Sequence, residues 1–366
     1  MPLKKLLLKS GVNRENTRYT SEGGWYECDK IRFRQGTPEK IGGWQRISAT
    51  TFQGVCRSLW NWVTLGSQNL IAVGTNLKYY IENGGAYNDI TPLRATVTLT
   101  NPFETTSGSP IVVVTDASGG YTDGDFVTYS GASAVGGLTL NGEYQITLTT
   151  TANEYTIDAG SAASSSATGG GTVTAAYQIN IGTAFAIPLT GWGASSWGSG
   201  TWGVGATSTE SIRLWSQSNF GEDLVFGPRN GPIYYWDATS GITTRAVELS
   251  TLGGASNVPT SQKLIEISDI NRFVFAFGAN EFASATVNPM LVRWSDQGSV
   301  TNWTPSATTQ AGFLTLSRGT EIIASKQARQ EVLVWTDAAL YSMQYVGAPV
   351  VWSAQLVGEN ISTASQ

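Results

Sequence analysis

The fold is decided by a short apolar stretch that recurs along the chain. Residues 272–278 read RFVFAFG and residues 331–336 read EVLVWT, and residues 69–74 (NLIAVG) and 223–227 (DLVFG) have a similar character. Each stretch is rich in aromatic and β-branched residues, which favour strands. A short apolar run without a polar alternate position is typical of a strand that is buried on both faces. The sequence therefore predicts an all-β protein in which these stretches are inner strands.

Each apolar stretch is the middle of a three-part unit, with an opening strand before it and an aromatic strand after it. The first unit has strands at 58–62, 69–74 and 77–81 and closes at 89–92. The second has strands at 212–215, 223–227 and 232–237, the third at 265–267, 272–278 and 290–294, and the fourth at 322–324, 331–336 and 340–345. Repeated antiparallel meanders of three or four strands predict propeller-like blades. A β-sandwich built from the same strands is the alternative.

A region of different composition, residues 93–182, separates the first unit from the second. It is rich in Thr, Ser and Gly, and it carries a net charge of -6, with Arg94 as its single cation against seven acidic residues. Short strands are expected at 111–114, 125–129, 142–147, 154–157 and 172–174, with a flexible loop at 161–171. We interpret this region as a small β-barrel inserted between the blades.

The most basic part of the chain is its N-terminal end, where residues 1–57 carry eleven Lys and Arg against five Asp and Glu, a net charge of +6. An extended arm over 1–22, ordered by a neighbouring subunit, is expected to precede a hairpin over 23–54. Ile31 and Phe33 alternate with cations, the turn is expected at 35–38, and the return strand at 41–44. The candidate subunit-interface residues are Lys30, Arg32, Arg34 and Lys40.

Two other readings of these cations stay open. They could meet DNA phosphates, but the row lacks the interleaved aromatic side chains that stack on bases. They could also be a solvated face without a partner.

The composition excludes several kinds of chemistry. The chain has no histidine, which removes Ser-His-Asp triads, Cys-His pairs and most zinc sites. The acidic residues are scattered at turns, and no glycine-rich phosphate loop with a following Lys occurs. We therefore predict no catalytic residue, no cofactor and no metal site. No apolar run is long enough to span a membrane.

Two smaller features have structural and functional interpretations. Cys28 and Cys56 are too few for a disulfide scaffold and are expected as buried reduced thiols, with pairing left open. Residues 191–203 carry tryptophans five apart, at Trp192, Trp197 and Trp202. A loop that packs these indoles into separate grooves is expected, and a carbohydrate-stacking platform is the alternative.

The chain resembles the tail nozzle (stabilisation) proteins of short-tailed bacteriophages. The resemblance rests on GGW at 23–25, CDKIRFR at 28–34, GTPEKIGGW at 36–44, LVWTD at 333–337 and LYSMQY at 340–345. The insert is similar to a barrel module common in phage structural proteins, through TDGD at 122–125, LNGEY at 140–144 and GTV at 171–173.

The resemblance implies a structural virion protein without enzymatic activity. Such a protein is assembled in the host cytoplasm and located in the virion tail, as a homo-oligomer, expected to be a hexamer. It forms a ring below the portal and adaptor and contacts other tail proteins. The ring lines the DNA ejection channel, through which double-stranded DNA passes transiently without specific binding. A β-propeller module that binds or hydrolyses host-surface glycans is the alternative function.

The expected organisation follows from these interpretations. It comprises the arm (1–22), the hairpin (23–54), the first blade (55–92), the inserted barrel (93–182), the further blades (183–358) and a C-terminal tail (359–366). Proteins of the nozzle family usually run considerably longer. The resemblance therefore implies either a shortened member or a chain that continues beyond Gln366.

Overall fold

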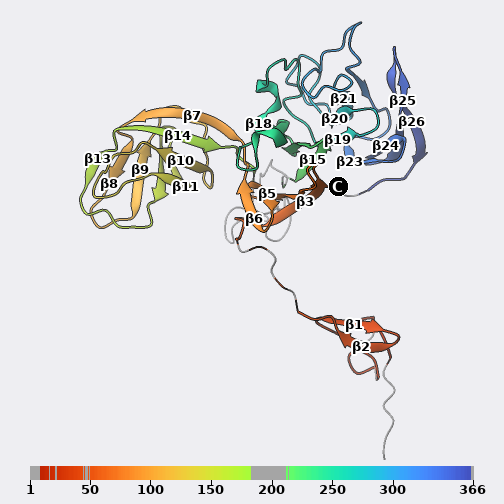
Figure 1. The fold of residues 1–366 in the computed structure, drawn as a ribbon, viewed down its shortest axis with the longest axis horizontal. Coiled ribbons are helices and arrows are strands. Elements are labelled where there is room, and N and C mark those ends of the chain that lie inside the picture. Colours follow the sequence, from red (N-terminus) through yellow and green to blue (C-terminus); the bar gives the residue numbers. More distant parts are fainter. Residues whose placement is uncertain are drawn as a thin grey trace, which may run out of the picture. The chain divides into compact units, whose positions relative to one another are not determined.

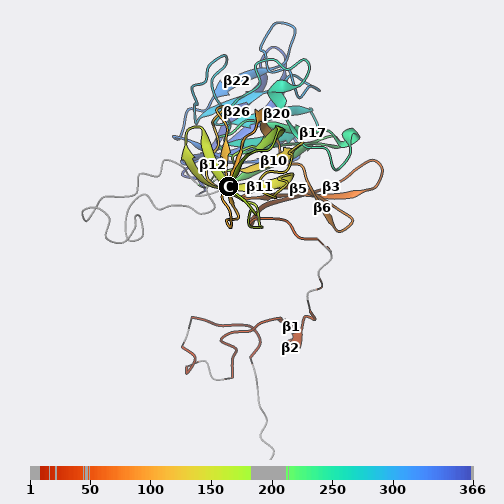
Figure 2. The ribbon, with the colours of Figure 1, turned by 90° about the vertical axis from the view of Figure 1, so that its left-hand side faces the viewer.

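The computed structural model describes residues 9–15, 17–20, 23–43, 45, 48, 50–182, 212 and 214–363. The chain folds as two compact units, residues 1–49 (unit 1) and 50–366 (unit 2). Strands dominate unit 2 and are the regular elements of the described part of unit 1 (Figures 1 and 2). The helices of the described part are two single 3-10 turns, Ala238–Ser240 and Leu249–Thr251, and neither could cross a membrane. The predicted all-β class is confirmed.

Unit 1 contains a two-stranded antiparallel hairpin, β1 (Ile31–Arg34) and β2 (Thr37–Lys40). Its turn is the dipeptide Gln35-Gly36, whose φ angles are 49° and 80°. Two consecutive positive φ angles give the tight turn whose twist matches that of the flanking strands. The turn is therefore shorter than the expected 35–38 turn.

The second strand of this hairpin also differs from the expectation. It begins at Thr37, and residues 41–43 are irregular, so the return strand expected at 41–44 is wrong. Pro38 lies inside β2 opposite Phe33, one pair away from the turn. In a hairpin with a two-residue turn this is a pair without ladder hydrogen bonds, so the missing N–H of proline costs no bond there.

Part of the expected arm is folded against the hairpin segment inside unit 1. The Lys9 N–H donates to the carbonyl of Gly23 at 2.6 Å, and the Asn13 N–H donates to the carbonyl of Trp25 at 2.9 Å. Val12 forms a parallel bridge with Trp25. Residues 1–8 of the arm lie outside the described residues.

Unit 2 contains four four-stranded antiparallel meanders, each paired in chain order. Blade 1 consists of β3 (Cys56–Val63), β4 (Asn69–Thr75), β5 (Tyr79–Asn83) and β6 (Ala86–Asp89). Blade 2 consists of β15 (Trp215–Phe220), β16 (Asp223–Pro228), β17 (Tyr234–Trp236) and β18 (Val247–Glu248). Blade 3 consists of β19 (Leu264–Ser268), β20 (Phe273–Phe277), β21 (Leu291–Trp294) and β22 (Gly312–Thr315). Blade 4 consists of β23 (Ile322–Gln327), β24 (Glu331–Thr336), β25 (Ala339–Gly347) and β26 (Val351–Glu359).

The predicted propeller-like blades are thus present, with one added strand in each. The second blade also opens later than expected, because β15 begins at Trp215, where the expected strand 212–215 ends. In blade 3 the apolar middle strand, β20, is buried on both faces, because every one of its residues is buried.

The blades are joined by apolar cores between their faces. One core contains Trp62, Leu70 and Tyr79 of blade 1 with Trp215 and Phe226 of blade 2. Similar cores join blade 2 to blade 3 and blade 3 to blade 4. The first strands of successive blades are neighbours, since β15 contacts both β3 and β19, and β19 contacts β23. The first strand of each blade is therefore the one nearest the axis of the array, and we call these four strands, β3, β15, β19 and β23, the inner strands from here on.

The insert is one eight-stranded antiparallel sheet in the order β13-β8-β9-β12-β11-β10-β14-β7. Its strands are β7 (Leu93–Thr100), β8 (Phe103–Thr105), β9 (Ile111–Thr115), β10 (Phe126–Ser130), β11 (Gly142–Thr151), β12 (Glu154–Asp158), β13 (Ala167–Gly169) and β14 (Thr172–Gln178).

This sheet curls into a nearly closed barrel because its two edges continue into each other. Strand β7 leads into β8 through two residues, and β13 leads into β14 through Gly170-Gly171. Strand β7 pairs with β14, and β8 pairs with β13. Gly170 has a φ of 111°, and a Cβ there would lie 2.5 Å from the Phe103 ring, so the corner requires glycine. The predicted barrel is confirmed, but β7, β8 and β13 were not expected, and β13 lies inside the expected 161–171 loop.

Two predictions and one contact remain to be placed. The tryptophan-rich stretch 191–203 lies outside the described residues. Cys28 and Cys56 are both free, and both are half-buried rather than buried. The barrel contacts blade 1 through Lys78, whose ammonium pairs with Asp89 at 3.1 Å and with Glu143 of β11.

Candidate functional site

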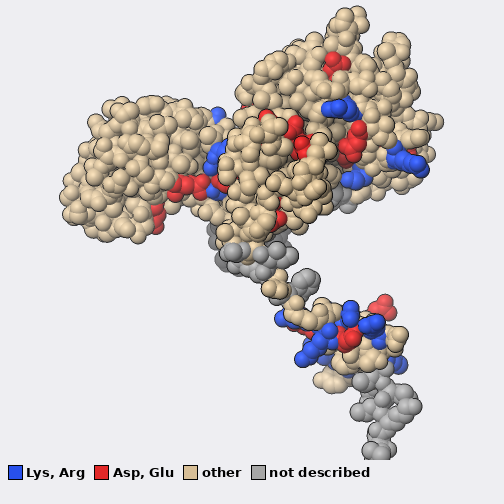
Figure 3. Space-filling view, in the orientation of Figure 1, with Lys and Arg blue, Asp and Glu red and all other residues tan. Residues whose placement is uncertain are grey.

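The four predicted interface cations are all exposed on the hairpin segment of unit 1, but Arg32 and Arg34 lie on one face of the hairpin and Lys40, which pairs with Ile31, lies on the other. Lys and Arg side chains gather on this unit in Figure 3. In β1, Ile31 and Phe33 are half-buried while Arg32 and Arg34 are exposed, as the alternating pattern predicts. Phe33 packs edge-on against Trp25, with ring centroids 6.1 Å apart, and this contact fixes which face of the strand carries the arginines.

The hairpin cations are only weakly engaged within their own unit. Arg32 Nε lies 3.0 Å from Glu39 Oε2, and Lys30 Nζ lies 3.8 Å from Asp29 Oδ2. All four side chains are largely exposed, and such pairs contribute at most about 1 kcal/mol each. Within the described residues, Arg34 and Lys40 form no ion pair. The charge is therefore available to an acidic surface.

A second candidate lies along the axis of the blades, where a cavity of about 690 Å³ is lined by all four inner strands. Its charged and aromatic lining residues come from all four blades and include Trp60 from β3, Glu266 from β19 and Lys326 from β23. The others are Trp62, Phe220, Asp269 and Arg272. A smaller cavity of about 180 Å³ shares Trp60, Glu266 and Lys326. The sequence places them far apart, and only the blade arrangement brings them together.

Glu266 is the most perturbed acid of this axial cavity. Its residue is 7% exposed, and burial raises the pKa of its carboxyl to about 7, although Lys326 acts in the opposite direction. Burial also raises the pKa of nearby Asp269, which Lys326 again opposes. A carboxyl with a pKa near neutrality can donate or accept a proton at physiological pH.

The cationic and aromatic groups of the cavity are fixed by neighbouring blades. Lys326 Nζ lies 5.4 Å from the centre of the Trp60 ring, a cation–π contact between blades 4 and 1. The Trp60 indole donates a hydrogen bond to Asn219 Oδ1 of blade 2. The cavity thus combines the ammonium of Lys326, the guanidinium of Arg272, two carboxyls and the indoles of Trp60 and Trp62, which suits a polar, hydroxylated ligand.

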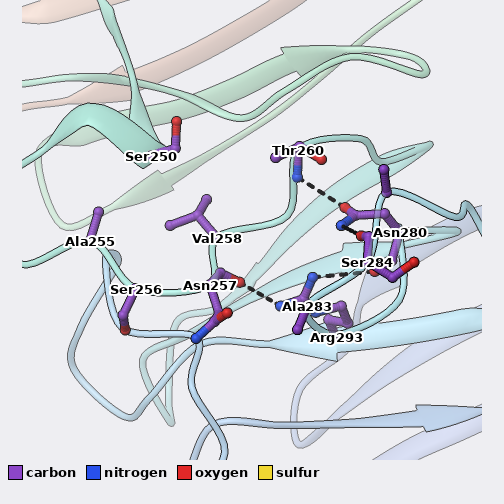
Figure 4. Close-up of a pocket in the computed structure, with 11 residues that line it drawn as sticks. Ser250, Ala255, Ser256, Asn257, Val258, Thr260, Asn280, Ala283, Ser284 and Arg293 are labelled. Atoms are coloured by element: carbon purple, nitrogen blue, oxygen red, sulfur yellow. Dashed lines mark hydrogen bonds between the residues drawn. The ribbon is translucent and has the colours of Figure 1, made fainter.

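A third candidate is a pocket of about 380 Å³ beside blade 3, which we call the Arg293 pocket (Figure 4). Arg293 belongs to β21 and is only 2% exposed. Its guanidinium donates hydrogen bonds to the main-chain carbonyl oxygens of Asn280, at 3.2 Å, and of Asn257. Hydroxyl-bearing residues, Ser250, Ser256, Thr260 and Ser284, line the same space.

Sequence reasoning found only the first of these three places. The LVRW stretch of β21 was interpreted as the aromatic strand of the third unit, and an arginine within it carried no signal of burial in a pocket. Its one available clue was a single cation in an otherwise apolar strand. Among the described residues, no cluster of three or more Cys, Asp and Glu side chains could hold a metal ion.

Comparisons with known proteins give no family. No protein-family model matches the chain, and no curated protein matches it. Two solved structures are distantly similar. The phage phi92 endosialidase is 13% identical, with a TM-score of 0.24 over 84% of this chain and 49% of that chain, so this chain spans about half of its length. Hsv2 of Kluyveromyces lactis is 9% identical, with a TM-score of 0.25 over 80% of this chain and 95% of that chain. At these TM-scores neither similarity bears on function.

Proposed function

We propose that this chain is a structural protein of a phage virion that forms the ring-shaped tail nozzle below the portal and adaptor and lines the DNA ejection channel. The observation that carries the proposal is a separate compact unit whose hairpin presents exposed cations with few internal partners. A basic surface of this kind is suited to an acidic surface on a neighbouring subunit. The resemblance of the same hairpin to nozzle proteins supports the assignment.

The physical properties of unit 2 suit a mechanical role. Continuous apolar cores join each blade to the next, so the array resists deformation as one body. The barrel carries a net charge of -6 and offers DNA phosphates almost no cations. Phosphate affinity comes mainly from Lys and Arg, so DNA would slide past such a surface without being retained.

The proposal is tested by the oligomeric state of the purified full chain. Native mass spectrometry is expected to show rings, with a hexamer as the expected order, and the double variant Arg32→Glu/Arg34→Glu is expected to shift the population to monomers. Arg329→Glu makes the same kind of charge change at an exposed position of unit 2 and serves as the control. Rings that persist in the double variant, or that dissociate equally in the control, would show that the hairpin cations do not hold the ring together.

DNA retention separates this proposal from a plain DNA-binding protein. A nozzle is expected to show little retention of duplex DNA at physiological salt. A DNA-binding protein would show strong retention that falls steeply with salt, because each phosphate contact releases a counterion.

A second candidate function, a module that binds or hydrolyses host-surface glycans, is favoured by one observation. The axial cavity holds Trp60 beside the carboxyls of Glu266 and Asp269, and indoles and carboxyls are the groups that stack on and act on sugars. Glycan-array binding or saccharide release that is lost in Glu266→Gln would support it. A protein without either activity would leave the cavity a structural feature of the blades.

A further inference from the structure

We propose that the Arg293 pocket binds a small hydroxylated carboxylate, of which a uronic acid is the simplest example. The proposal does not depend on the nozzle assignment. It starts from a buried cation that has no counter-ion. Among the ion pairs of the described residues none involves Arg293, and burial is the one cause that lowers the pKa of its guanidinium, to about 10.

A buried charge without a partner is costly, and proteins normally pair it or replace it. Arg293 keeps its charge. Its guanidinium carbon lies 5.9 Å from the centre of the Phe282 ring, a cation–π contact, and its N–H groups donate to the carbonyl oxygens of Asn257 and Asn280. These two bonds use two of the five N–H donors of an arginine. Carbonyl oxygens orient the group but carry no full negative charge, so the site still favours an anion.

Hydrogen bonds within the protein fix the walls of the pocket. The side-chain amide of Asn280 accepts from the Thr260 N–H at 2.9 Å and donates to the carbonyl of Ser284 at 2.7 Å. Figure 4 shows these bonds on one side of the pocket and the Arg293 bonds beside them. Asn257 and Ala283 have φ angles of 50° and 54°. A left-handed alanine is unfavourable by itself, so the surrounding bonds hold this wall in place.

The chemistry of the lining selects the ligand class. Arg293 is the single Lys or Arg among the lining residues, so the pocket can neutralise one negative charge and not the two of a phosphate. The planar fork of a guanidinium matches a carboxylate in two parallel hydrogen bonds. The hydroxyls of Ser250 and Ser256 donate to Glu248 and Asn302, so their oxygens can accept from the ligand, and the hydroxyl of Ser284, which accepts from the Thr286 N–H, can donate to it. The volume, about 380 Å³, lies at the lower end of the roughly 300–1,000 Å³ typical of small-molecule sites.

The pocket is open to solvent, since Ser250, Asn257 and Ala285 at its rim are exposed. Arg293 itself is only 2% exposed, so a ligand that pairs with its guanidinium has to displace the side chains around it. Ala285 offers a way to block the pocket without touching the guanidinium, because an indole at this position would occupy the entrance.

Isothermal titration calorimetry of the full chain tests the proposal with D-glucuronate, D-glucose and inorganic phosphate. Glucuronate and glucose differ in the carboxylate, so glucuronate is expected to bind at least about tenfold more tightly, since a charge-assisted pair is lost with the neutral sugar. Phosphate is expected to bind more weakly than glucuronate. Arg293→Lys keeps the charge but loses the planar fork, and an approximately tenfold weaker binding is expected.

Ala285→Trp keeps the proposal testable if Arg293→Lys does not fold. It is expected to abolish glucuronate binding with an unchanged circular dichroism spectrum. Ala307→Trp, at an exposed alanine outside the pocket, is the matched control and is expected to bind as the unmodified chain does. No saturable heat with millimolar glucuronate, equal binding of glucose, tighter binding of phosphate, or full binding by Ala285→Trp would each overturn the assignment.

Discussion

The contact between blades 1 and 2 depends on the absence of a side chain at Gly74. A Cβ at this position of β4 would lie 2.4 Å from Ser58 Oγ and 2.4 Å from Cδ1 of Trp215, where 3.4–4 Å is ordinary contact. Trp215 has little freedom to retreat, because it is buried and its indole N–H donates to the carbonyl of Thr75 at 2.7 Å. Gly74→Ala should therefore force the indole away from blade 1.

The expected cost follows from two effects. Adding a methyl group to a filled core costs about 1–3 kcal/mol. Displacing the indole also strains or breaks its hydrogen bond, which contributes about 1 kcal/mol. The loss of backbone freedom in the unfolded chain acts in the opposite direction by about 0.4–1 kcal/mol. We therefore expect Gly74→Ala to lower the free energy of unfolding by about 1–3.5 kcal/mol.

Urea unfolding followed by far-ultraviolet circular dichroism measures this change. Gly66→Ala is the matched control in the same blade, because a Cβ there would meet only Thr64 Oγ1, at 3.6 Å. Its free energy of unfolding should change by less than about 0.5 kcal/mol. In a Trp215→Leu background, the cost of Gly74→Ala should fall, since the clashing ring is gone. Equal costs in the two alanine variants, or an undiminished cost in the leucine background, would refute the steric explanation.

Two further predictions concern buried charges. Because the pKa of Glu266 is raised from 4.5 to about 7 in the fold, the folded state holds its proton more tightly, so the stabilisation is complete below pH 4.5 and is lost as the pH rises to 7. The free energy of unfolding should fall by up to about 3 kcal/mol over this range, and Glu266→Gln should flatten a urea-midpoint profile against pH. Lys78→Met leaves Glu143 without its cation, while Asp89 keeps its ion pair with Arg245, and should cost about 2–4 kcal/mol by calorimetry. Part of the lost stability should be recovered in Lys78→Met/Glu143→Gln. If Lys78→Met is as stable as the unmodified chain, the contact of Lys78 with the barrel does not stabilise the fold.

The blades were predictable because their middle strands carry a strong local signal. The stretch over 273–277 has no polar residue, and its structure is the fully buried β20. The outermost strands gave no such signal. Strand β18 is the two residues Val247–Glu248, and β6 reads AYND, so both owe their conformation to pairing with a neighbour. The residues of these two strands carry no local signal that predicts this pairing.

The hairpin shows why a turn is harder to place than a strand. Gly36 and Pro38 are both turn residues by type, and they suggested a longer connection. The actual turn needs a positive φ at Gln35, and glutamine is not a residue type that predicts a positive φ. Once the two-residue turn forms, Pro38 falls on a pair that requires no N–H, and the alternating exposure of β1 follows as predicted.

The cavities could not be predicted because their residues are joined only by the tertiary structure. The axial cavity brings Trp60 and Lys326 within 5.4 Å, although most of the chain separates them in sequence. Arg293 is more instructive. A cation in an apolar strand predicts exposure by residue type, since arginine is rarely buried. Its burial depends on two carbonyl oxygens from separate loops, which sequence periodicity does not place.

The fourth blade differs from the first at the position that accepts the next blade. Thr75 and Thr336 end the second strands of these blades, and each hydroxyl bonds the main chain three residues further on. The residue before each threonine is therefore equivalent. In blade 1 it is Gly74, which leaves room for Trp215 of blade 2. In blade 4 it is Trp335, a half-buried residue with a large side chain where blade 1 has none. The face of blade 4 that corresponds to the blade 1–blade 2 contact thus lacks the gap on which that contact depends, so a partner at this face would have to pack against the indole instead of inserting beside a glycine.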